Sequence, residues 1–171
     1  ILNRFLGTLQ PYPFERLRAL LAGVTPSPRH TAVSLSIGEP RHPTPALIID
    51  ALRDATAGLA VYPPTAGSPA LRQAIAGWIS RRYGIPAPHA DTQVLPVNGS
   101  REALFSFAQV VLDPATDATV ICPNPFYQIY EGAALLAGAR TWFVNQTADN
   151  GFCFDLDAVP AEVWQRCRLL F

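Results

Sequence analysis

Apolar residues in the first half of the chain recur at intervals of three and four, which is the spacing of one face of a helix. One predicted helix covers residues 13–20 and opens on a proline, and two more follow Thr44-Pro45 and Ser68-Pro69. Serine and threonine cap helix starts, and proline fits the first helical turn. The last of these helices is expected to end at Gly84, and a short apolar run at 32–37 predicts a strand.

The second half of the chain alternates short apolar runs with amphipathic segments. Predicted strands cover residues 94–97, 118–122, 141–144 and 168–171, and predicted helices begin after Gly99 and cover 126–136 and 160–165. Strands separated by amphipathic helices are typical of a parallel sheet with right-handed crossovers. We therefore predict an α/β fold whose mainly parallel sheet carries helices on both faces.

The composition favours a globular protein of 171 residues, 49% of them hydrophobic, with a formal net charge of zero. No basic stripe indicates binding to nucleic acid or to an anionic membrane. No apolar run approaches the length of a membrane span. Cys122, Cys153 and Cys167 have no metal-ligand spacing, so we predict no metal site and interpret them as reduced, buried thiols of a cytoplasmic protein.

All 13 lysine-plus-arginine residues are arginines, so any lysine amine that a mechanism needs must come from outside this chain. The chain has no initiator methionine and stops on the apolar run Leu169-Leu170-Phe171. We therefore expect it to be a fragment of a longer protein, cut at both ends.

The segment at 94–112 is the best candidate for a ligand site. In open parallel sheets, ligands bind beyond the carboxyl ends of the strands. A helix that starts there presents unpaired amides to an anion. Gly99 allows close approach of the backbone, Ser100 adds a hydroxyl, and Arg101 adds a positive charge. These residues could hold a phosphate, although an ordinary helix start with an exposed arginine has the same pattern.

Other candidate residues are individually ambiguous. Tyr127 follows the next predicted strand at the same edge, where its ring could stack on a planar cofactor or simply pack in the core together with Tyr130. Ile37 and Gly38 lie at a strand end that could bind a carboxylate, or they form a plain turn. Tyr62 lies in a proline-rich loop.

Taken in order, these segments resemble the fold-type-I, class I/II aminotransferases. The matching segments are Ser34-Leu-Ser-Ile-Gly-Glu-Pro40, Tyr62 with Gly67 and Leu71-Arg72, Asn98-Gly-Ser-Arg-Glu-Ala-Leu104, and Pro125-Phe-Tyr127 with Tyr130 and Gly138. Within the family, residues 9–14 and 124–132 are most similar to succinyldiaminopimelate aminotransferases of bacterial lysine biosynthesis.

The resemblance implies a cofactor, pyridoxal 5'-phosphate, and a role for each site residue. Gly99, Ser100 and Arg101 would hold its phosphate, and Tyr127 would stack on its ring. Ile37 and Gly38 would meet the substrate carboxylate. Tyr62 would reach the partner's cofactor across a homodimer interface.

The resemblance also implies a domain organisation and an activity. Residues 1–44 would form an N-terminal arm and small-domain segment, and 45–171 the first part of the cofactor-binding large domain. The complete enzyme would move an amino group between glutamate and a 2-oxo acid, in this subfamily on N-succinyl-LL-2,6-diaminopimelate. The Schiff-base lysine of the family would lie beyond Phe171, so this chain alone is expected to be inactive.

Two groups of alternatives stay open at this point. One is another aminotransferase, acting on aspartate or on aromatic amino acids. The other is a module without catalysis: a phosphate-binding or assembly module, or more remotely a transcription regulator, although no basic segment here resembles a DNA-binding helix-turn-helix.

Overall fold

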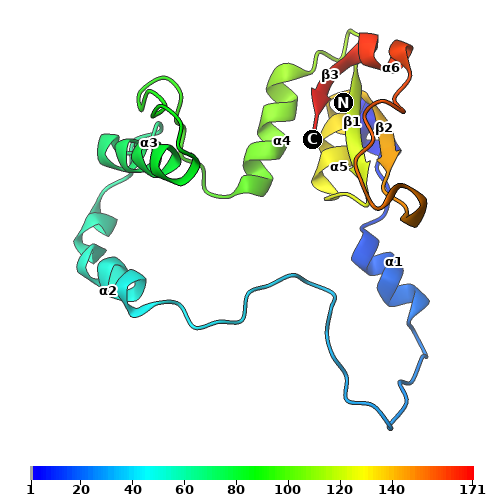
Figure 1. Cartoon of the computed structure of the whole chain (residues 1–171), viewed down its shortest axis with the longest axis horizontal. Coiled ribbons are helices and arrows are strands. Elements are labelled where there is room, and N and C mark those ends of the chain that lie inside the picture. The colour runs from blue at the N-terminus through cyan, green and yellow to red at the C-terminus, as the bar shows by residue number, and fades with distance from the viewer. Residues whose placement is uncertain (1) are drawn as a thin grey trace. The chain divides into compact units, whose positions relative to one another are not determined.

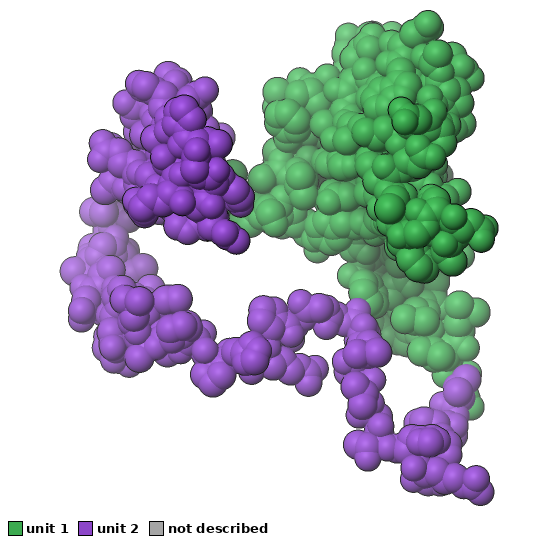
Figure 2. Space-filling view, viewed as in Figure 1, with its two compact units in different colours: residues 1–23, 97–171 green, residues 24–96 purple. Residues whose placement is uncertain are grey.

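The computed structural model describes residues 2–171, and the chain divides into two compact units. Unit 1 combines residues 1–23 with 97–171, and unit 2 consists of residues 24–96. Figure 2 colours the two units separately. The α/β sheet lies entirely in unit 1.

Unit 2 is built from helices. It contains α2 (Ala46–Asp54), the short 3-10 helix η2 (Thr56–Ala60) and α3 (Pro69–Tyr83). The start of α3 forms as predicted, because the Ser68 side chain accepts a hydrogen bond from the Leu71 amide at 3.2 Å. The start of α2 differs by one residue from the prediction, since Pro45 rather than Thr44 is its N-cap.

Two predicted strands are absent from the described structure. Residues 32–37 and 94–97 adopt no strand conformation. An apolar run favours an extended backbone, but a strand also needs a neighbouring backbone to complete its hydrogen-bond ladder. Within residues 2–171, neither run is paired with such a neighbour.

Unit 1 contains the remaining elements. These are η1 (Arg4–Thr8), α1 (Pro13–Leu20), α4 (Ser100–Val111), β1 (Thr119–Asn124), α5 (Ile129–Leu136), β2 (Arg140–Asn145), η3 (Ala148–Asn150), α6 (Ala161–Arg166) and β3 (Cys167–Leu170). The helix predicted over 126–136 starts three residues later than expected, because the residues after β1 form a turn. The other predicted elements of this half lie within two residues of their expected bounds.

The sheet of unit 1 is parallel, as predicted. Its order is β2-β1-β3, so β1 lies between the strands that follow it in sequence. The three arrows point the same way in Figure 1, and α4 runs in the opposite direction, with its first turn toward the carboxyl ends of the strands. The chain leaves β1 toward one neighbour and later returns to its other side, and such a switch point is where open α/β sheets bind ligands.

Each face of the sheet is covered by its own core. Val120 and Cys122 face the cluster formed with α4 and α5, whereas Ile121 faces the cluster that includes Val163 of α6. This alternation follows from the two-residue period of a strand. The first four residues of β1 are buried, and three of them, Val120 to Cys122, form a continuous apolar run, as expected for a strand covered on both faces.

The cysteines are free thiols, but only Cys122 is buried. Cys153 is exposed, which corrects the expectation that all three thiols are buried. It lies in the loop after η3, which the sequence pattern did not distinguish from a packed segment. Across residues 2–171, no helix is both long and apolar enough to cross a membrane.

Candidate cofactor site

The first turn of α4 offers free backbone donors. Gly99 is the N-cap, and no side chain caps this helix. The first backbone bond of the helix runs from the Ala103 amide to the Gly99 carbonyl at 3.2 Å. The amides of Ser100, Arg101 and Glu102 therefore have no intrahelical acceptor, as at any helix start. These donors and the helix dipole favour an anion.

The backbone at Gly99 is suited to glycine alone. Its φ is 156° and its ψ 140°, in a region that residues with a side chain rarely adopt. A Cβ placed there would lie 2.5 Å from Oε2 of Glu102. The Glu102 carboxylate thus lies close to Gly99.

Tyr127 lies in the turn that follows β1. Its side chain is 42% exposed. Its ring meets that of Tyr130 edge-on at 5.9 Å, and Tyr130 stacks flat on Phe171 at 4.2 Å. The two tyrosines therefore differ: Tyr130 packs against the core, whereas Tyr127 keeps exposed ring surface on which a planar group could stack.

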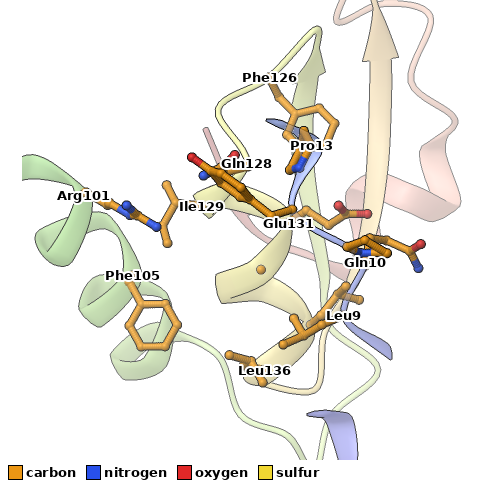
Figure 3. Close-up of a pocket in the computed structure, with 14 residues that line it drawn as sticks. Leu9, Gln10, Pro13, Arg101, Phe105, Phe126, Gln128, Ile129, Glu131 and Leu136 are labelled. Atoms are coloured by element: carbon orange, nitrogen blue, oxygen red, sulfur yellow. The ribbon is translucent and has the colours of Figure 1, made fainter. Parts of the chain in front are cut away.

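Next to the helix start, a cavity of about 300 Å³ lies between α4, α5 and the N-terminal segment. Figure 3 shows the Arg101 side chain directed toward Ile129 at this cavity. Phe105 and Leu136 contribute to its apolar wall, and Gln10, Gln128 and Glu131 contribute polar groups. The Arg101 side chain thus lines this cavity, while its backbone amide belongs to the first turn of α4. No periodic pattern along the chain marks these three polar lining residues.

The remaining predicted site residues belong to unit 2. Tyr62 is 99% exposed, and Ile37 is 70% exposed. A Cβ added to Gly38 would meet no atom within 4 Å. These positions are accessible within their own unit, and their roles stay predictions.

The residues of unit 1 fit a phosphate joined to an aromatic ring. The free amides at the start of α4 suit the phosphate, and the turn that contains the partly exposed Tyr127 follows the carboxyl end of β1. Among the described residues, no group of histidine, cysteine and carboxylate side chains is arranged to hold a metal ion.

Comparison with known proteins identifies the family. The family model for aminotransferases of class I and II matches residues 30–171. The chain belongs to this family. Members of the family are pyridoxal phosphate-dependent, in agreement with the cofactor predicted from the sequence.

Relatives of known sequence include LL-diaminopimelate aminotransferases. Those of Nitratidesulfovibrio vulgaris and Desulforudis audaxviator are 36% and 37% identical over 168 residues. In both cases the match covers 97% of this chain and 42% of the relative. The chain therefore spans less than half the length of these relatives.

Solved structures show the same fold. An aminotransferase from Neisseria meningitidis is 49% identical with a TM-score of 0.89, over 99% of this chain and 43% of that one. An aminotransferase from Helicobacter pylori is 40% identical with a TM-score of 0.83, over 95% of this chain and 41% of that one. The structure is thus the N-terminal part of a fold-type-I aminotransferase.

Proposed function

We propose that the polypeptide carrying this chain transfers an amino group between glutamate or 2-oxoglutarate and an amino acid or 2-oxo acid pair, with pyridoxal phosphate bound at the carboxyl edge of the sheet in unit 1. The uncapped first turn of α4, with its glycine-only backbone, carries this proposal. Bound pyridoxal phosphate is an electron sink for the bond that breaks at the α-carbon of the amino acid.

The chain's own residues bind and orient the cofactor. The amides after Gly99 and the hydroxyl of Ser100 would donate hydrogen bonds to the phosphate, and Arg101 would add positive charge. The Tyr127 ring would provide a stacking surface for the aromatic ring of the cofactor. Because the chain contains no lysine, the amine that binds the cofactor and moves the proton belongs to residues outside 1–171.

Unit 2 carries the remaining residues to which we assign a role. Ile37 and Gly38 bind the substrate carboxylate through the backbone, and Tyr62 reaches the cofactor phosphate of the partner in a homodimer. We further propose that residues 1–44 belong to the arm and small domain and 45–171 to the large domain, and that the enzyme works in the cytoplasm.

The proposed substrate is a diaminopimelate derivative. The relatives named above are LL-diaminopimelate aminotransferases, and residues 9–14 and 124–132 resemble the succinyldiaminopimelate enzymes. We propose N-succinyl-LL-2,6-diaminopimelate as the amino donor. The two candidate donors differ in charge, because succinylation replaces one ammonium group with an amide and adds a carboxylate.

The test is glutamate formation by the complete polypeptide loaded with pyridoxal phosphate. N-succinyl-LL-2,6-diaminopimelate, unmodified LL-diaminopimelate, aspartate and phenylalanine are compared as donors to 2-oxoglutarate. The succinylated donor should give the highest kcat/KM. A higher value for another donor would replace the substrate assignment, whereas glutamate formation from none of them, without uptake of pyridoxal phosphate, would overturn the proposed function.

A further inference from the structure

A hydrogen bond between two asparagines closes the carboxyl edge of the sheet beside the turn that carries Tyr127. Asn124 is the last residue of β1 and Asn145 the last of β2, and the two are direct partners in the parallel register. Nδ2 of Asn124 donates to Oδ1 of Asn145 at 2.8 Å. The two strand ends are therefore tied through their side chains as well as their backbones.

The loop after β2 strengthens this link. Nδ2 of Asn150 donates to the Asn145 carbonyl at 2.9 Å, and the amide of Thr147 donates to Oδ1 of Asn150 at 2.8 Å. The Gln146 amide donates to the Asn124 carbonyl at 2.8 Å. The backbone and side chain of Asn145 are thus both engaged, which restricts where Asn124 can lie.

Asn124 is three residues before Tyr127, so its position sets where the turn begins. A second anchor lies between them, because Phe126 stacks on Phe143 of β2 with ring centroids 4.9 Å apart. The turn is therefore attached to β2 by a hydrogen bond before Tyr127 and by an aromatic stack next to it. The Tyr127 ring meets the Tyr130 ring edge-on at 5.9 Å.

We propose that Asn145 is a positioning residue of the cofactor site: through Asn124 it holds the turn so that the Tyr127 ring stays at the orientation that stacks on the cofactor. This inference rests on the proposed function, since it concerns the same site. In this proposal Asn145 acts through Asn124 and the turn, and its effect on the cofactor passes through Tyr127.

Three variants of the complete holoenzyme test the proposal. Asn145→Leu removes the acceptor at similar volume. Asn145→Asp keeps an acceptor for Nδ2 of Asn124. Gln146→Ala is the matched control, because the neighbouring Gln146 side chain makes no hydrogen bond to any of the residues 2–171. The readouts are the dissociation constant of pyridoxal phosphate and the circular dichroism of the cofactor band at saturation.

Asn145→Leu should weaken cofactor binding about 2- to 10-fold, the range set by one net hydrogen bond, and should change the dichroic band of the saturated enzyme. Asn145→Asp should restore the band, and Gln146→Ala should leave both readouts unchanged. In a Tyr127→Ala background, Asn145→Leu should have no additional effect, because coupled residues show non-additive changes.

Three results would overturn the proposal. One is that Asn145→Leu lowers only the melting temperature, which indicates a purely structural role. Another is an equal loss of affinity with Tyr127 present and absent. The third is a wild-type enzyme that takes up no pyridoxal phosphate, which would overturn the proposed function and this inference with it.

Discussion

Replacing Gly99 with alanine tests the most specific feature of the proposed site. The substitution adds one methyl group at the N-cap of α4, where φ is 156°. The new Cβ would lie 2.5 Å from Oε2 of Glu102. That atom is the end of a flexible side chain and can rotate away, whereas the backbone conformation cannot be kept without strain.

The expected loss of stability or of cofactor affinity can be estimated from the backbone conformation at residue 99. Holding a residue with a side chain in such a sparsely populated conformation costs about 1–3 kcal/mol. If the backbone instead relaxes to a common conformation, the first amides of α4 turn away from their present direction. In both cases Gly99→Ala should lower the free energy of unfolding or the affinity for pyridoxal phosphate, by about 1–3 kcal/mol in total.

The assay combines urea unfolding of the complete polypeptide with titration of pyridoxal phosphate. Gly132→Ala in α5 is the matched control, since a Cβ there meets nothing within 4 Å and alanine is favoured over glycine inside a helix by about 0.5–1 kcal/mol. The control should be at least as stable as the wild type. If Gly99→Ala matched the wild type in both stability and cofactor affinity, the reasoning about this helix start would be refuted.

Four further predictions concern the Tyr127 ring, the core residue Ile121 and, in two experiments, the Cys122 thiol. Tyr127→Phe should keep cofactor affinity near the wild-type value in a titration, whereas Tyr127→Ala should reduce it by the equivalent of about 0.5–1.5 kcal/mol; equal affinities would exclude stacking. Ile121→Ala should lower the free energy of unfolding by about 2–5 kcal/mol because Ile121 is fully buried, while Val110→Ala, at a position 82% exposed, should change little in the same urea experiment. Burial, with a smaller contribution from the Glu131 charge, raises the pKa of Cys122 from 9.0 to about 12, so at pH 8 iodoacetamide should label the exposed Cys153 first. The same raised pKa contributes stability that is complete below pH 9 and is lost as the pH rises toward 12, and unfolding measured across that range should show the loss.

Much of the fold of unit 1 could be predicted from local pattern. The helix start at Pro13 and, in unit 2, the start at Ser68-Pro69 were visible because capping and proline signals act within one turn of the chain. The parallel sheet could be predicted because its strands are short apolar runs separated by helices. The prediction of a strand at 32–37 was wrong. A strand needs a neighbouring strand to complete its hydrogen bonds, and a local sequence pattern does not identify that neighbour.

The site was only partly visible in the sequence. The helix start at Gly99 and the turn at Tyr127 could be found, because each follows a strand-like run and carries a distinctive residue. The Arg101 side chain could not be placed, and the structure directs it into the cavity beside α5. The bond between Asn124 and Asn145 was also invisible, because it joins residues 21 positions apart.

The sequence alone thus determined the order of the elements, the two-sided burial of β1 and the glycine that opens α4, because each depends on neighbouring residues and on the period of apolar positions. Only the tertiary structure decided that β1 lies between β2 and β3, that the Glu102 carboxylate lies close to Gly99, and that Tyr127 keeps ring surface exposed while Tyr130 packs inward. These features depend on which distant segments come to lie together, and that is set by packing over the whole sheet rather than by any single stretch of chain.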